Sequence, residues 1–382
     1  MTITFFYLAL NHHEAPVVDE LYNVIGNDLV FVELVDMSNR KEGKKGSSEV
    51  FSNRPYLLKA WESSENEQKA MELARDSDVA LFCGFPSLRF QIERLKENRL
   101  SFEVSERWLK RGLYGILSPR LMRVFLNYHL RKWKNRPLYR LCSSAFAAGD
   151  HARLGMYRGM CYKWGYFTKV EEYESPTLQV SSMQKSVTIM WCSRFLKWKH
   201  PELVIQLAAK LKREGYPVKI DMFGSGPEEE ATMILCRQLD VCDVVSFKGS
   251  APNEDILQEM RSHAIFLFTS DRNEGWGAVL NEAMSNRCAV VASDAIGSAP
   301  FLIRDGKNGL LFRSGQVNSL YEKVVCLMKN PEERRIMADH GYQDMLHVWS
   351  PQNAAKNLLQ LIDDLRVGRE TSIINGPCSK AE

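Results

Sequence analysis

Two glutamates, Glu274 and Glu282, lie on either side of a turn that is rich in glycine. Glu274 follows shortly after the apolar run 265–268 and opens the sequence Gly-Trp-Gly, and Ala278 then begins a predicted helix that carries Glu282. Glycines at a strand-to-helix turn let backbone amides approach a ligand closely, and the start of a helix favours a diphosphate. Because parallel strands end at one edge of their sheet, we expect both carboxylates to face the same crevice.

The spacing of these glutamates is weak support on its own, because such a pair arises by chance about once in a chain of this size. A solvent-facing acid in a loop and an unrelated acid on a helix would give the same pattern. Two cations favour a shared ligand-binding role for the glutamates. Arg194 and Lys199 follow the predicted strand 186–192, where a loop would present a fork and a point charge to phosphate groups. Ordinary surface cations are the alternative.

A second glycine-rich turn, Phe-Gly-Ser-Gly-Pro at 223–227, follows another predicted strand. It is not a dinucleotide fingerprint, because Glu229 occupies the position where that motif needs its third glycine. A nicotinamide cofactor is therefore disfavoured.

Short apolar runs alternate with amphipathic stretches along the chain, which predicts an α/β fold with parallel, doubly wound sheets. In the first half the predicted strands are 3–10, 29–34, 56–60, 79–82 and 101–104, and the predicted helices are 17–25, 65–75 and 86–97. In the second half the strands are 186–192, 218–223, 244–247, 265–268 and 289–292, and the helices are 201–212, 228–238, 254–262, 278–285 and 331–365. Two tandem domains follow from this alternation.

Length and composition agree with two globular domains. A chain of 382 residues exceeds the usual size of a single core, and 45% apolar with 25% charged residues is ordinary. The net charge of +3 gives no reason to expect nucleic acid. The apolar start lacks a basic region and a cleavage site, so we expect a buried strand there and not a signal peptide. Nine scattered cysteines without a CxxC pair indicate neither zinc nor disulfides, and predict a cytoplasmic protein.

As an ordered set, the motifs resemble the C-terminal domain of the family 4 retaining glycosyltransferases, of the bacterial surface-polysaccharide type. The similarity spans about 187–365 and consists of Arg194…Lys199, Phe-Gly-Ser-Gly-Pro at 223–227, Phe-Lys-Gly at 247–249, Glu-Gly-Trp-Gly…Glu-Ala-Met at 274–284, Asp-Gly-Lys-Asn-Gly-Leu-Leu-Phe at 305–312 and His-Val-Trp-Ser at 347–350. This resemblance implies the GT-B fold, in which two Rossmann-like domains enclose a cleft.

The resemblance also implies roles for individual residues. Glu274 would bind the hydroxyls of the donor sugar, and Arg194 and Lys199 would neutralise the departing diphosphate; these three are the expected catalytic residues. The expected donor-binding residues are Glu282, Gly275, Trp276, Gly277, Ala278, Val279, Gly224, Phe247 and Lys248. The implied donor is a nucleotide sugar, with UDP favoured. No cofactor and no metal are expected, because cations and amides can stabilise the leaving phosphate.

The expected division places an acceptor-binding domain at 1–168, a linker at 169–185 and a donor-binding domain at 186–348. A C-terminal helix at 349–367 would pack back on the first domain, and 368–382 would be a loose tail.

The acceptor side resembles the family less closely. The run Asn-His-His-Glu-Ala-Pro at 11–16 replaces a glycine-rich loop, and Val-Ser-Glu-Arg-Trp at 104–108 lacks a histidine that relatives carry. His12, His13, Glu106 and Arg107 are the acceptor-side candidates, although a lone loop histidine is more often merely solvated. An inverting enzyme would need one of these side chains as a base, whereas the leaving phosphate can serve in a retaining one.

Thirteen Lys or Arg residues against three Asp or Glu lie between positions 94 and 140, and aromatic residues are interleaved with them. This stretch could rest on the inner face of an anionic membrane and present the site to a lipid-linked saccharide, or it could be a solvated helix beside the core. No nucleic-acid partner is expected, because no base-reading motif is present. The alternatives to a sugar transferase are a GT-B nucleotide-sugar epimerase and a catalytically inactive protein that binds sugar nucleotides.

Overall fold

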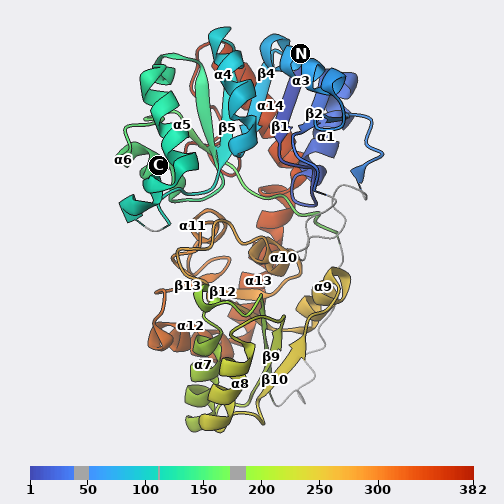
Figure 1. The fold of residues 1–382 in the computed structure, drawn as a ribbon. Helices are drawn as coiled ribbons and strands as arrows, with labels where there is room; N and C mark the ends of the chain where they lie inside the picture. The colour runs from blue at the N-terminus through green and yellow to red at the C-terminus, as the bar shows by residue number, and fades with distance from the viewer. Residues whose placement is uncertain (38–50, 111, 173–185) are drawn as a thin grey trace. The chain divides into compact units, whose positions relative to one another are not determined.

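The computed structural model describes residues 1–37, 51–110, 112–172 and 186–382. The chain forms two compact units. The first domain comprises Met1–Lys169 together with Trp349–Glu382, and the second domain comprises Val170–Val348 (Figure 1). The predicted linker at 169–185 lies for the most part outside the described residues.

The first domain is built on seven parallel strands in the order β3-β2-β1-β4-β5-β6-β7. The strands are β1 (Ile3–Tyr7), β2 (Leu29–Glu33), β3 (Leu57–Lys59), β4 (Val79–Cys83), β5 (Ser101–Ser105), β6 (Leu138–Cys142) and β7 (Cys161–Lys163). All residues of β1 are buried, as expected for a strand covered on both faces. The first five strands confirm the predictions, whereas β6 and β7 were missed.

The helices of this domain are α1 (Ala15–Ile25), α3 (Ser64–Asp76), α4 (Leu88–Lys96), α5 (Pro119–Leu130), α6 (Ala147–Arg153) and α14 (Pro351–Arg366). The short 3₁₀ turns are η1 (Gly26–Asp28), η2 (Phe85–Ser87), η3 (Gly112–Leu117) and η4 (Trp133–Asn135). Although α14 comes last in the chain, it packs against α1. Strand order reverses between β1 and β4, and this reversal defines the edge at which doubly wound sheets bind ligands.

The second domain has six parallel strands in the order β10-β9-β8-β11-β12-β13. The strands are β8 (Val187–Cys192), β9 (Val218–Phe223), β10 (Val245–Gly249), β11 (Ile265–Phe268), β12 (Ala289–Ser293) and β13 (Leu310–Phe312). The helices are η5 (Lys197–Lys199), α7 (Pro201–Arg213), α8 (Glu229–Gln238), α9 (Asn253–Ser262), α10 (Val279–Ser285), α11 (Ala299–Leu302), α12 (Val317–Lys329) and α13 (Pro331–His347). Here the strand order reverses between β8 and β11.

The part predicted to be helical at 331–365 consists of two helices, because the Ser350 hydroxyl accepts from the amide of Asn353 and Pro351 begins a new helix, α14. One prediction about the C-terminal part is wrong. The segment 368–382 is not a loose tail throughout. Cys378 is fully buried and its amide donates to the Lys163 carbonyl at 2.7 Å. The Lys163 amide in turn donates to Ser379, since the edge strand β7 offers unpaired backbone groups.

None of the helices in the described ranges is long and apolar enough to cross a bilayer.

Candidate active site

The site of the second domain begins where β8 and β11 lie side by side at the reversal of strand order. The loop after β8 (193–200) and the loop after β11 (269–278) leave the sheet at its carboxyl edge and are joined by hydrogen bonds. The Asp271 amide donates to the Trp198 carbonyl at 2.9 Å, and the Thr269 hydroxyl donates to the Lys199 carbonyl at 2.6 Å. The two loops therefore form one rigid frame.

Within this frame Lys199 and Glu274 form a buried ion pair. Their exposed fractions are only 9% and 7%, and the Ser270 hydroxyl donates to the same Glu274 oxygen at 2.9 Å. Burial lowers the pKa of Lys199, and the Glu274 carboxylate opposes that shift. The residue predicted to bind phosphate, Lys199, and the residue predicted to bind the sugar, Glu274, thus bind each other.

Arg194 lies near this pair, because its charge contributes to the lowered pKa of Lys199. The Arg194 side chain is exposed and has no hydrogen bond or ion pair within the described residues. It is therefore a cation that remains available to an anionic ligand.

The glycine-rich turn is shaped by a buried tryptophan. Trp276 is fully buried, its indole donates to the Asn281 side chain at 2.9 Å, and its carbonyl accepts from the Ser298 hydroxyl at 2.6 Å. Gly277 has φ +86°, and a Cβ there would lie 2.4 Å from the Phe268 ring. Only glycine fits this position. The backbone amide of Gly277 has no acceptor within the described chain, so it is open to a ligand.

The other turn residues lead directly into α10. Gly275 is buried, Ala278 occupies the N-cap position and Val279 is the first helical residue. The helix has seven residues and carries Glu282.

Glu282 is the second carboxylate of the site. Its side chain has no hydrogen bond or ion pair in the part of the chain that the structure describes, and Cys192 at the end of β8 lies near enough to feel its charge. Burial raises the pKa of Glu282 to about 7. A carboxyl group that is poised and unpartnered in this way is typical of a ligand-binding position.

Gly224 in the loop after β9 serves mainly to bring loops together. Its φ is +121°, and a Cβ there would lie 1.9 Å from the Ser193 carbonyl oxygen. Its amide donates to the Gly249 carbonyl at 2.7 Å, which ties the loop to the end of β10. The structure therefore places Gly224 beside the β8 loop that carries Arg194.

The two candidates on β10 differ in position. Phe247 is half-buried, and its ring centroid lies 6.1 Å from that of Phe195 in the β8 loop. Lys248 instead pairs with Asp221 of β9 at 3.5 Å. The structure thus brings Phe247 towards the predicted site, whereas the described contact of Lys248 is away from the Lys199–Glu274 pair.

In the first domain, a chain of side chains crosses the carboxyl edge of the sheet. The rings of His12 and His13 lie 3.8 Å apart, and His13 stacks on Tyr166 at 5.0 Å. The Tyr166 hydroxyl donates to Glu106 at 2.8 Å, and the other Glu106 oxygen accepts from Lys110 at 2.8 Å. Three of the four acceptor-side candidates therefore belong to one network.

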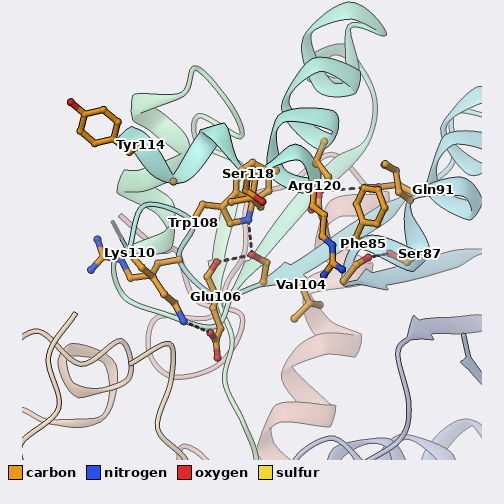
Figure 2. Close-up of a pocket in the computed structure, with 18 residues that line it drawn as sticks. Phe85, Ser87, Gln91, Val104, Glu106, Trp108, Lys110, Tyr114, Ser118 and Arg120 are labelled. Carbon is orange, nitrogen blue, oxygen red and sulfur yellow. Dashed lines mark hydrogen bonds and ion pairs between the residues drawn. The ribbon is translucent and has the colours of Figure 1, made fainter. Parts of the chain in front are cut away.

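A cavity of about 590 Å³ lies beside this network, at the ends of β4 and β5 and next to α5 (Figure 2). Glu106, Trp108 and Lys110 line it. The fourth candidate, Arg107, also lines it, but its guanidinium is bound to the buried carboxylate of Asp150 at 3.3 Å.

The basic stretch at 94–140 is less uniform than its composition suggests. Arg94 is fully buried and donates to backbone carbonyls, including those of Asp78 at 3.0 Å and Leu100 at 2.8 Å. Arg140 is fully buried and pairs with Glu103 at 2.6 Å. These arginines stabilise the fold and are not surface cations.

Several participants were missed at the sequence level. Ser270, Tyr166 and Lys110 carry no motif. Ser270 and Lys110 each bind a glutamate four residues away, and Tyr166 binds Glu106 from 60 residues away. No group of three or more His, Cys, Asp and Glu side chains that could hold a metal ion occurs among the described residues.

Comparison with known proteins identifies the second domain. Residues 179–344 match the family described as glycosyl transferases group 1. This domain is a group 1 glycosyltransferase domain. The resemblance inferred from the ordered motifs is thereby confirmed, and the group 1 domain contains the Lys199–Glu274 pair, Arg194 and Glu282.

Curated relatives and solved structures agree with this assignment. The chain is 28% identical to poly(glycerol-phosphate) alpha-glucosyltransferase of Bacillus subtilis. The match covers 50% of this chain and 28% of that protein. The chain is also 28% identical to N-acetyl-alpha-D-glucosaminyl L-malate synthase of Bacillus anthracis over 40% of its own length and 39% of that protein. The matches thus span about a third of these relatives.

Whole-chain similarity is seen in the fold. Anabaena Alr3699/HepE in complex with UDP matches with a TM-score of 0.73 at 15% identity, covering 95% of this chain and all of that one. The lipopolysaccharide outer core galactosyltransferase WaaB matches with a TM-score of 0.70 at 15% identity, covering 96% of this chain and all of that one. The predicted GT-B class, with two Rossmann-like domains, is confirmed.

The buried pair generates a first prediction. Lys199→Met leaves the Glu274 carboxylate buried without its cation, and we expect the free energy of unfolding to fall by about 3 kcal/mol. Glu274→Gln should cost a similar amount, whereas the double variant should recover most of the loss because neither charge remains unpaired. Urea denaturation gives the free energy of unfolding of the wild type, the two single variants and the double variant. A loss in the double variant equal to the sum of the two single losses would contradict the pairing.

Glu282 generates a second prediction. Its pKa is raised from 4.5 to about 7, so the folded state keeps a proton that the unfolded state releases. The free energy of unfolding should therefore fall as pH rises from about 4.5 to about 7. Glu282→Gln removes this pH-dependent loss. At about pH 8 the free energy of unfolding of the variant should therefore exceed that of the wild type by about 1–3 kcal/mol.

The stability difference should vanish below about pH 3.5, where the carboxyl group is protonated in both the folded and the unfolded state. Glu230→Gln, on the exposed face of α8, is the matched control and should track the wild type throughout. Parallel profiles for the wild type and Glu282→Gln would show that Glu282 is not held as the structure indicates.

Proposed function

We propose that the chain transfers a sugar from a nucleoside diphosphate donor to a saccharide or lipid-linked saccharide. The observation that carries this proposal is the arrangement in the group 1 domain, where the buried Lys199–Glu274 pair lies beside the unpartnered Arg194 at the reversal of strand order. Glycosyl transfer builds negative charge on the leaving phosphate, and fixed cations stabilise that charge without reorganisation.

Each residue has a place in the proposed reaction. The Arg194 guanidinium donates two hydrogen bonds to the diphosphate, and the Lys199 ammonium contacts both the leaving phosphate and Glu274. Glu274, oriented by Lys199 and Ser270, accepts hydrogen bonds from hydroxyls of the donor sugar. The backbone amides of Trp276 and Gly277 fix the sugar, and Glu282 binds the ribose hydroxyls.

We propose that the transfer retains the configuration of the sugar, as the family resemblance implies. The departing phosphate accepts the proton of the attacking hydroxyl, so no side-chain base is required. We further propose that the reaction needs no metal, because Arg194 and Lys199 supply the positive charge. UDP is the favoured nucleotide, with Phe247–Ser250 beside the base, and the UDP bound in the HepE structure supports this choice. The names of the poly(glycerol-phosphate) alpha-glucosyltransferase and of the lipopolysaccharide outer core galactosyltransferase support a role in surface polysaccharide synthesis.

The donor assignment can be tested by thermal shift. We expect saturating UDP to raise the melting temperature, equivalent to about 2.7 kcal/mol at a hundredfold excess over Kd. Arg194→Ala should lose at least tenfold in UDP affinity, about 1.4 kcal/mol, because a charge-assisted contact to phosphate is removed. Arg213→Ala, an exposed arginine in the last turn of α7, is the control and should bind UDP normally.

Transfer assays complete this test. A UDP-sugar should be consumed only with an acceptor, and the rate should be unchanged by EDTA. Conversion of the UDP-sugar to its epimer without an acceptor would indicate that the protein is a nucleotide-sugar epimerase. Binding without any turnover would indicate an inactive partner, and absence of any nucleotide shift would refute the donor site.

We also propose that the acceptor is reached at a membrane surface. Leu113, Tyr114 and Leu117 of η3 are 64%, 82% and 65% exposed, and Leu126 and Leu130 of α5 are exposed as well. These apolar side chains lie among the surface cations of the 94–140 stretch, a combination that favours an anionic bilayer.

The membrane contact predicts a specific loss. Leu113→Ser with Leu117→Ser should abolish most co-sedimentation with phosphatidylglycerol vesicles while leaving UDP binding intact. Val24→Ser with Val367→Ser, which removes two other exposed apolar side chains of the same domain, should bind vesicles like the wild type. Equal binding by both double variants would place the contact elsewhere.

A further inference from the structure

The charged side chains that line the cavity of about 590 Å³ in the first domain indicate which charge the acceptor carries. Its lining carries three cations, Arg107, Lys110 and Arg120, and two carboxylates, Glu103 and Glu106. The following inference rests on the proposed function, because it takes the first domain as the acceptor side.

Both carboxylates of the cavity are already neutralised. Glu103 pairs with the buried Arg140 at 2.6 Å and accepts a hydrogen bond from Tyr157. Glu106 pairs with Lys110 at 2.8 Å and accepts from Tyr166. Neither glutamate is therefore an open acceptor for a cationic ligand.

Of the three cations, Arg107 is held by Asp150 and Lys110 by Glu106. The Arg120 side chain has no hydrogen bond or ion pair among the described residues. Figure 2 shows it extending from α5 into the cavity towards Phe85 and Val104. Arg123, one turn further along α5, lies 5.7 Å from the centroid of the Phe85 ring and adds positive potential on this side.

The remaining lining complements this charge. Ser118 lines the cavity, and its hydroxyl makes no capping bond to α5, so it can donate to a ligand. Phe85, Leu121 and Val124 provide an apolar wall. One uncompensated guanidinium, a free hydroxyl and an apolar wall fit a phosphate ester better than a neutral saccharide, which would leave the guanidinium unused.

We propose that the acceptor carries a phosphate group, and that Arg120 binds this phosphate in the cavity with Ser118 as a second donor. The organic part of the phosphate ester lies against Phe85 and Leu121. The phosphate could belong to a free sugar phosphate or to a lipid headgroup, and the two arms of the experiment below distinguish these sources.

The first arm is calorimetric titration with glucose 6-phosphate. We expect Arg120→Ala to bind at least about tenfold more weakly than the wild type, since a charge-assisted contact is lost. Arg131→Ala, which removes an exposed cation that donates to Asn127 and lies outside the cavity lining, should match the wild type. Arg194→Ala should match it too, which excludes binding at the donor site.

The second arm is co-sedimentation with phosphatidylcholine vesicles that contain phosphatidic acid. A loss in Arg120→Ala that Arg131→Ala does not share assigns the phosphate to a lipid headgroup, whereas such a loss in the titration alone assigns it to a soluble ester. Either result supports the proposal. It is overturned if Arg120→Ala equals Arg131→Ala in both arms.

UDP binding is measured on the same variants and separates the two hypotheses. If UDP binds in an Arg194-dependent manner but neither phosphate probe depends on Arg120, this inference fails while the donor site stands. If UDP fails to bind and phosphate binding depends on Arg120, the proposed transfer fails while the phosphate site stands.

Discussion

The buried ion pair between Lys199 and Glu274 is the constraint on which the donor side of the molecule depends. Two charges removed from water are tolerated only when they satisfy each other, so the loops that carry them must meet. The backbone bonds between Trp198 and Asp271 and between Lys199 and Thr269 hold that meeting in place. The pair thus holds the two loops together and also supplies one cation and one carboxylate that can bind a ligand.

The two domains use the same sheet geometry for different purposes. In each, two parallel strands pair at the reversal of strand order, and the loops that follow them leave the sheet at its carboxyl edge. The second domain fills this place with cations, glycines and buried carboxylates suited to a diphosphate. The first places the His13–Tyr166–Glu106–Lys110 network there, beside a cavity in which only Arg120 keeps an unneutralised charge within the described residues.

Most strands could be predicted because their side chains are almost wholly apolar, as in Ile265–Phe268. Strand β6 was missed because Arg140 interrupts its apolar run, and the arginine is tolerated there only through Glu103 on the adjacent strand β5. The C-terminal residues 376–381 looked like a tail because their sequence is short and polar. Their order comes from the free edge of β7, which no local pattern reveals.

By itself the sequence determined the fold class, the group 1 domain and the identity of Arg194, Lys199, Glu274 and Glu282 as its candidate ligands. Periodicity and ordered motifs are local properties, so they can be read along the chain. Only the tertiary structure decided that Lys199 and Glu274, 75 residues apart, neutralise each other, whereas the side chains of Arg194 and Glu282 have no partner among the described residues. Pairing, burial and the resulting pKa values depend on distances across the sheet, and the chain order alone does not contain those distances.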